Sequence, residues 1–299
     1  MGAPRSGTTW LHAMLAHHPV VLHHNSETTF FGSYVKPLED EWKSELEHAR
    51  KDPEQNKDFR GIASKISERD FAAVLGQFVN AFYENLNMEE GKTHYLEKAP
   101  DNVFAVHTIK RFRPDAKFIH IIRDGRNMAV SSMATRESRG WGARNASAGA
   151  LSWKRSILAG REARDAYPGD YLEVFYESLL ADCKVQLKGI LDFCNIDCDE
   201  VVLDDIVKAY DFSNAKLSSP TSGVERNNGK SPAAWKTKMG PWDRYMFCLN
   251  AGDLLKDLGY AEDDWWYANK SQRIRLELEW RVRRMLVRGG RVLMRMDKR

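Results

Sequence analysis

Short apolar runs that alternate with helical segments constrain the fold of this chain most. Residues 117–122 form a nearly continuous apolar run of strand length, and residues 170–175 form a second one. We expect a helix from about Arg126 after the first run, and another over 179–193 after the second. Strands without an exposed polar face suit a sheet covered on both sides, and alternation with helices predicts parallel strands. The sequence therefore indicates an α/β fold with a central parallel sheet flanked by helices.

Further helices are expected on either side of these strands. Residues 67–86 carry apolar side chains at helical spacing, with Ser67 as the N-cap. We also predict helices over 8–18, from Asp101 to near Pro114, over 146–167 and over 244–258. The charge-rich residues 36–62 and the Ser-, Asn- and Gly-rich residues 214–241 are expected to form loops, the first with short helices.

The composition suits a folded chain of ordinary charge. Of 299 residues, 42% are hydrophobic and 11% aromatic, which supplies a sizeable core, and the net charge of +3 does not call for nucleic acid. No run of 18 apolar residues is present. The four cysteines and the histidines near residues 17–24 lack the spacing of metal ligands, so we expect no metal, reduced thiols and a cytoplasmic location.

A phosphate-binding loop is indicated at the start of the chain. Gly2 and Gly7 have the G-x-x-x-x-G spacing and lead directly into the first expected helix. Such a loop directs backbone N–H groups toward an anion at a helix N-terminus. A nucleotide kinase would carry Lys and then Ser/Thr after the second glycine, but this chain has Thr8 and Thr9 there, and its cation is Arg5 within the loop. The pattern favours an anion held without a metal.

Two later segments supply further anion-binding groups. Arg123 follows the first predicted strand and Ser131 lies eight residues on. Residues at the carboxyl end of a parallel strand face the ligand crevice, so both side chains are expected to reach one phosphate. Arg226 and Gly229, within a long polar loop, suit a lid that closes over a phosphate.

In this order the segments resemble the PAPS-dependent sulfotransferases, in particular the bacterial and heparan-sulfotransferase-like branch (PAPS is 3′-phosphoadenosine 5′-phosphosulfate). The similarity covers residues 1 to about 258 and implies a three-layer P-loop-type fold, PAPS as donor and no metal. It places Arg5, Ser6, Gly7, Thr8, Thr9 and Trp10 around the 5′ end of the donor and Trp10 and Tyr176 beside the adenine. It also places Arg123, Ser131, Arg226 and Gly229 at the 3′-phosphate.

The catalytic base can be assigned in two ways from this resemblance. Glu27, ahead of Phe30-Phe31, is similar to the base of heparan-type and many bacterial sulfotransferases, and Lys98 in Glu-Lys-Ala-Pro is similar to their charge-stabilising lysine. The alternative base is His94 in Lys-Thr-His, as in cytosolic members. We favour Glu27 with Lys98 and Arg5 at the chemistry, and expect partial burial beside the two phenylalanines to raise the pKa of Glu27.

We expect a sulfotransferase domain over 1–260 and a basic helical extension over 261–299. Family members carry a full apolar strand before the phosphate loop, whereas here only residues 1–3 precede Pro4. The strand is therefore expected to be truncated. The same hypothesis includes a membrane anchor in the missing upstream part. Residues 271–299 hold ten Lys/Arg against three Asp/Glu. They are interpreted either as a solvated helix packed on the domain or as a helix attracted to anionic lipid or an acidic partner.

The expected function is transfer of a sulfuryl group from PAPS to a hydroxyl or amine by in-line displacement. The acceptor is expected to be a small molecule or a carbohydrate. Two alternatives from other classes stay open: a Mg²⁺-dependent P-loop kinase or hydrolase, against which the missing lysine counts, and a non-catalytic anion-binding protein.

Overall fold

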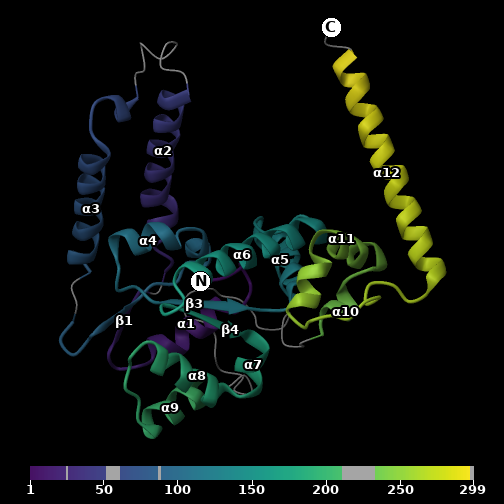
Figure 1. Ribbon diagram of the computed structural model, residues 1–299. Helices are drawn as coiled ribbons and strands as arrows, with labels where there is room; N and C mark the ends of the chain where they lie inside the picture. Colours follow the sequence, from purple (N-terminus) through teal and green to yellow (C-terminus); the bar gives the residue numbers. More distant parts are fainter. Residues whose placement is uncertain (25, 52–60, 87–88, 211–232, 297–299) are drawn as a thin grey trace. The chain divides into compact units, whose positions relative to one another are not determined.

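A computed structural model describes residues 1–24, 26–51, 61–86, 89–210 and 233–296, with backbone alone at 49–51 and 287–296. The chain forms two compact units, and Figure 1 labels their helices and strands. Unit 1 comprises Met1–Arg123 and Ser156–Glu225, and unit 2 comprises Asp124–Arg155 and Arg226–Arg299. The boundary expected near residue 260 stays a prediction. No helix in the described part of the chain is both long enough and apolar enough to cross a bilayer.

Unit 1 contains two parallel pairs of strands. β1 (Val21–His23) pairs with β2 (His94–Leu96), and β3 (Phe118–Ile122) pairs with β4 (Tyr171–Phe175). The two strands expected from the sequence are thus found and are parallel, as predicted. Met1 extends the second pair, because its amino group donates to the Ile119 carbonyl at 2.9 Å and its carbonyl accepts from the Ile121 N–H at 3.1 Å.

Helices cover both faces of the β3–β4 pair. Ile121 and Val174 face one core, which they share with buried side chains of α1, α8 and α9. Phe118 and Tyr171 face a second core, with buried side chains of α3 and α4. This alternation gives the α/β layering that the sequence predicts. The helices of unit 1 are α1 (Thr8–Ala16), α2 (Lys36–Lys51), α3 (Glu68–Glu84), α4 (Val106–Phe112), α7 (Tyr176–Ala181), α8 (Cys183–Phe193) and α9 (Glu200–Tyr210), and shorter turns lie at η1 (Phe31–Val35), η3 (Ile62–Ser64) and η4 (Pro100–Phe104).

A helix packs closely against the sheet around a buried histidine of β3. His120 on β3 is fully buried and is hydrogen-bonded through Nδ1 to the Tyr171 hydroxyl at 2.6 Å. Gly160 of α6 (Ala146–Ala166) faces this pair, and a Cβ on that glycine would lie 2.3 Å from the same ring nitrogen. Burial lowers the pKa of His120 to about 3, so the ring is neutral near pH 7.

The expectation of a loop over 36–62 is wrong for its first part. Residues 36–51 form the long helix α2, in which Lys36 pairs with Asp40 at 2.5 Å and Lys43 with Glu39 at 3.2 Å. These i, i+4 pairs support a helix whose surface is charged. Trp42 anchors it by stacking on Phe71 of α3, with ring centroids 4.3 Å apart. A segment that looked too polar for regular structure therefore folds as an amphipathic helix.

The helix expected over 179–193 is divided in two. α7 ends at Ala181 and α8 begins at Cys183, because Asp182 leaves the helical conformation and its carboxylate accepts the Val185 N–H at 3.2 Å. An aspartate N-cap thus restarts the helix. The helix expected over 67–86 is confirmed, with Ser67 accepting the Asp70 N–H at 3.1 Å.

Unit 2 is helical and is organised around a buried ion pair. Arg126 donates to both carboxylate oxygens of Asp124, from Nε at 3.0 Å and Nη2 at 2.8 Å, and the two side chains are 5% and 6% exposed. The same guanidinium lies 3.9 Å from the Trp235 ring and 4.7 Å from that of Trp265. The helices are α5 (Gly125–Arg139), the first half of α6, α10 (Trp235–Lys238), α11 (Pro241–Asp257) and α12 (Lys270–Met296).

Candidate active site

The loop before α1 has the backbone conformation that an anion cradle requires. Arg5 has φ 73° and Gly7 has φ 102°, both in the left-handed region. A Cβ at Gly7 would lie 2.6 Å from Cδ2 of Tyr176, so glycine is needed there for space as well as for conformation. The Ser6 hydroxyl is buried and has no hydrogen-bond partner among the described residues. A buried orphan hydroxyl beside a helix N-terminus fits the binding of an anionic group.

Arg123 joins this loop to the ends of β3 and β4. The residue follows β3 directly, and its Nη1 donates to the Arg5 carbonyl at 3.2 Å. Its guanidinium also lies 4.4 Å from the centroid of Tyr176, the first residue after β4. The loop backbone, Arg123 and Tyr176 therefore meet at the carboxyl end of the β3–β4 pair, where ligands of parallel sheets bind.

Trp10 extends this group along the first turns of α1. Its ring lies edge-on to Tyr176 with centroids 5.8 Å apart, and its Nε1 donates to the Tyr210 carbonyl at 3.2 Å. The structure thus brings together the two aromatic residues that the resemblance assigns to the adenine. Their contact with a nucleotide stays a prediction.

A second group of polar side chains lies where β2 ends. Lys98 forms an ion pair with Glu27 at 2.5 Å, and its Nζ lies 3.5 Å from the Thr9 hydroxyl of the phosphate loop. The ammonium is therefore placed between the candidate base and the candidate anion cradle. This is the position from which a cation can offset charge that develops on a leaving phosphate.

Glu97 was not singled out by sequence reasoning, yet it fixes the segment that carries Glu27. Its Oε1 accepts from the Thr28 hydroxyl at 2.6 Å and from the Asn102 amide at 3.4 Å. Thr28 in turn accepts the Phe30 N–H at 3.3 Å, and Thr29 between them adopts a left-handed φ of 49°. The signal was present in the Glu-Lys pair at 97–98, of which only the lysine was assigned a role.

The expected burial of Glu27 is not found. Its side chain is 39% exposed and pairs with Lys98, whereas Phe30 and Phe31 turn into the core beneath. Phe30 stacks on Phe82 with ring centroids 3.9 Å apart. The Glu27 carboxylate is therefore solvent-accessible and paired with a lysine.

His94, the alternative base, lies at the opposite end of β2 from Lys98. Its Nδ1 is 2.8 Å from the Thr93 hydroxyl, and the residue pairs with Val21 across the strands. Since ligands of parallel sheets bind at the carboxyl ends of strands, this placement favours Glu27 as the base.

Three further residues were predicted at the 3′-phosphate. Ser131 lies on α5, which belongs to unit 2, and its carbonyl accepts from the Thr135 hydroxyl at 2.8 Å. Arg226 and Gly229 lie outside the described residues. Their assignment to the 3′-phosphate stays a prediction.

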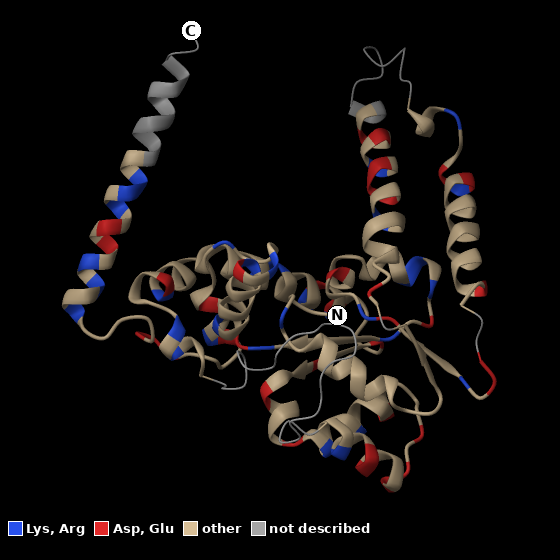
Figure 2. Ribbon diagram, turned by 180° about the vertical axis from the view of Figure 1, so that it is seen from behind, with Lys and Arg blue, Asp and Glu red and all other residues tan. Residues whose placement is uncertain are grey.

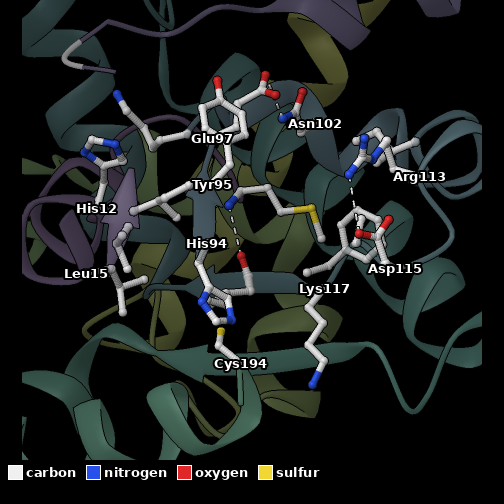
Figure 3. A pocket seen from close by; sticks show the side chains of 18 of the residues that line it. His12, Leu15, His94, Tyr95, Glu97, Asn102, Arg113, Asp115, Lys117 and Cys194 are labelled. Carbon is white, nitrogen blue, oxygen red and sulfur yellow. Dashed lines mark hydrogen bonds and ion pairs between the residues drawn. The ribbon is translucent and has the colours of Figure 1, made fainter. Parts of the chain in front are cut away.

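A cavity of about 740 Å³ opens beside the site, between β2 and β3. Among the described strands, β2 pairs with β1 and β3 pairs with β4, and on its other edge β3 is hydrogen-bonded to Met1. Beyond Met1, both strands present an edge to the cavity. Figure 3 shows His94, Tyr95 and Glu97 along one side and Lys117 on the other. Burial, and then the charge of Lys98, lower the pKa of the Met1 amino group to about 5 at the end of this cavity.

Comparison with known proteins identifies the family. A family model described as "Sulfotransferase family" matches residues 1–200. The chain belongs to the sulfotransferase family. As a member, it is similar to protein-tyrosine sulfotransferase A of Caenorhabditis elegans, at 27% identity over 87% of this chain and 66% of that protein, so the match spans just under two thirds of the relative. Protein-tyrosine sulfotransferase 1 of Danio rerio is also 27% identical, over 87% of this chain and 70% of the relative.

Solved sulfotransferase structures share the fold. The sulfotransferase domain of the Curacin biosynthetic pathway aligns with a TM-score of 0.54 at 18% identity, covering 87% of this chain and 96% of that domain. Mouse SULT7A1, complexed with PAP, aligns with a TM-score of 0.53 at 17% identity, covering 87% of each chain. The α/β fold class expected from the sequence is thereby confirmed for this sulfotransferase.

Proposed function

We propose that this sulfotransferase moves a sulfuryl group from PAPS to a hydroxyl acceptor. The observation that carries the proposal is the meeting of three features at the carboxyl ends of the strands. These are the phosphate loop, the Arg123 guanidinium that donates to the Arg5 carbonyl, and the Lys98–Glu27 pair that reaches Thr9. They supply anion binding and proton transfer at one place.

The donor is held, in this proposal, by charge and by backbone amides. The first turn of a helix leaves N–H groups without an acceptor within the helix, and the orphan hydroxyl of Ser6 lies two residues before α1 begins. Arg123 adds a positive charge at the same strand end. PAPS carries its negative charge at two separate places, the 5′-phosphosulfate and the 3′-phosphate, whereas ATP carries all of it in one triphosphate chain. A site with anion-binding groups at two places therefore suits PAPS.

The transfer itself is a displacement at sulfur. A bond forms from the acceptor oxygen to sulfur while the bond from sulfur to the phosphate oxygen breaks, which leaves PAP. The acceptor proton passes to the Glu27 carboxylate, which is partly exposed and therefore reachable by an acceptor. Lys98, paired with Glu27 and close to Thr9, offsets the negative charge that appears on the departing phosphate.

For the acceptor we propose a hydroxyl of a tyrosine side chain or a carbohydrate. The relatives named as protein-tyrosine sulfotransferases support the first, and the motif resemblance around Glu27 and Lys98 supports the second. Both present a hydroxyl from which Glu27 would remove a proton, so the chemistry of the site is shared.

The proposal is tested by incubating the protein with PAPS labelled in its sulfur and with two acceptor panels, tyrosine-containing peptides and oligosaccharides. We expect transfer to one panel, undiminished by a metal chelator. Glu27→Gln should lower kcat by about 10²-fold or more, the usual contribution of a general base, whereas the control Glu68→Gln, on the surface of α3, should leave kcat unchanged. Phosphoryl transfer from ATP that needs Mg²⁺ would instead support a kinase. PAPS binding without transfer to any acceptor would support a non-catalytic binding protein.

A further inference from the structure

Helix α12 has two apolar faces, of which its own unit covers one. Leu276 is 2% exposed, and the Arg283 guanidinium lies 4.7 Å from the Trp242 ring of α11. At roughly 100° per residue these two positions share one side of the helix. That side is the inner face, which packs within unit 2.

The other side of α12 carries an exposed apolar stripe. Its members are half exposed or more: Ile274 at 57%, Leu278 at 54%, Val282 at 50% and Met285 at 64%. Their spacing of four, four and three residues aligns them along the helix, roughly opposite Leu276. Isolated exposed apolar residues are ordinary, but a contiguous row points to an interaction site.

Basic side chains flank this stripe. Arg281 and Arg275 lie on either side of it by helical spacing, and within the described part of the chain neither forms an ion pair. The two glutamates of the helix are already neutralised, Glu277 by Arg273 at 3.0 Å and Glu279 by Arg283 at 2.6 Å. Figure 2 shows Lys and Arg spread along the helix. The exposed face is therefore apolar along its centre and positive at its margins.

A second copy of the chain is a poor partner for this face. A coiled coil needs apolar residues at alternating spacings of three and four. At that spacing Leu278, Val282 and Met285 share one seam, and the next positions on either side are Arg275 and Gly289, so an arginine and a glycine bound its three apolar members. Two such helices side by side would also bring like charges together.

We propose that the outer face of α12 binds an anionic lipid surface. A helix with an apolar stripe between arginines lies in the plane of a membrane interface, with the stripe among acyl chains and the arginines at phosphate groups. The charge pattern selects anionic over zwitterionic lipid. This inference is independent of the transfer chemistry, because it concerns binding alone.

Co-sedimentation of the whole protein with vesicles tests the proposal. We expect binding to phosphatidylcholine vesicles that contain phosphatidylglycerol and little binding to phosphatidylcholine alone, with the bound fraction falling as salt is raised. Leu278→Ser with Val282→Ser should weaken binding about tenfold or more, since both side chains lose their place among acyl chains. Arg275→Gln with Arg281→Gln should weaken binding and flatten its salt dependence.

The matched control is Val74→Ser with Phe78→Ser on α3, where the two side chains are 62% and 45% exposed at the same spacing of four. This pair should leave vesicle binding unchanged. Three results would each overturn the proposal: equal binding to both kinds of vesicle, no binding to either, or unchanged binding by the Leu278 and Val282 variant. A concentration-dependent dimer that the same variant abolishes would overturn it in favour of self-association.

Discussion

Gly7 occupies the point where the phosphate loop comes closest to the strand ends. Its positive φ and the nearby Tyr176 ring make two separate demands, conformational freedom and the lack of a side chain. The sequence predicted a glycine loop, but it did not reveal that Tyr176, far along the chain, is the residue that fills the space. That contact depends on the packing of β4 beside β3.

Gly7→Ala is expected to lower both stability and donor affinity. The added Cβ would meet the Tyr176 ring and must push aside either the ring or the loop. We expect the affinity for PAP, measured by calorimetry, to fall at least about tenfold, because the cradle is displaced. The control is Gly91→Ala, which also has positive φ but open space around it. It should cost only the roughly 1 kcal/mol of a left-handed alanine, and equal losses for both variants would contradict this account.

At the level of elements, the edges of β2 and β3 face a cavity of about 740 Å³. Met1 pairs with β3 at one end of it, and the Gly2 N–H donates to the Pro100 carbonyl at 3.3 Å on the other side. Residues 1 and 2 thus lie between the two strand pairs, in the direction of a parallel strand.

An extension of about five apolar, β-branched residues before Met1, the length of an ordinary strand, is expected to pair with both edges and raise Tm. It would fill apolar space and replace a buried amino group by an amide, which needs no charge. Differential scanning calorimetry measures the change. An extension of equal length made of Gly and Ser is the control, and equal Tm values for the two extensions would show that the cavity does not accept a strand.

The elements also show how far sequence reasoning reached. Residues 117–122 and 170–175 were recognisable as strands because they are apolar on both faces. Residues 36–51 were not recognised as helix α2, because the contacts that hold it are distant in sequence. Glu39 accepts from the Thr108 hydroxyl at 2.5 Å and from Arg111 at 2.7 Å. Burial alone would raise the pKa of Glu39, but these hydrogen bonds outweigh burial and hold it below its ordinary value. The motifs likewise assigned roles to Lys98 and Glu27, but the ion pair between them depends on the packing of distant segments and was not predicted.

On the scale of the whole molecule, buried polar groups affect the free energy of unfolding, because removing one partner leaves the other buried and unpaired. The Asp124–Arg126 pair in unit 2 illustrates this, since both side chains are almost fully buried. Asp124→Ala would leave the Arg126 charge with the Tyr260 carbonyl at 2.5 Å but without its carboxylate. Breaking one side of a buried pair costs roughly 3–5 kcal/mol. We expect that loss in denaturant unfolding, and a loss below about 1 kcal/mol would contradict a structural role for the pair.

Folding stability should also fall in mild acid because of His120. Below about pH 6.5 the unfolded chain binds a proton at this ring, whereas the folded chain does so only near pH 3. The stabilisation that comes from the proton-binding difference at His120 is therefore complete above pH 6.5. As the pH falls toward 3, the free energy of unfolding decreases by about 1.4 kcal/mol per pH unit. His120→Asn should make the slope of unfolding free energy against pH shallower by about that amount. The exposed His48→Asn should keep the wild-type slope, and an unchanged slope in His120→Asn would refute the assignment.

The central claim is that Arg123 and the phosphate loop together bind a doubly phosphorylated adenosine without a metal. Titration calorimetry with PAP and with ATP, each with and without Mg²⁺, tests it on the wild type, Arg123→Ala and the surface control Arg69→Ala. We predict that the affinity for PAP does not depend on Mg²⁺. Arg123→Ala should lower this affinity at least about tenfold, and Arg69→Ala should leave it unchanged. Equal PAP affinity in the wild type and Arg123→Ala, or tighter binding of Mg²⁺–ATP than of PAP, would contradict the claim.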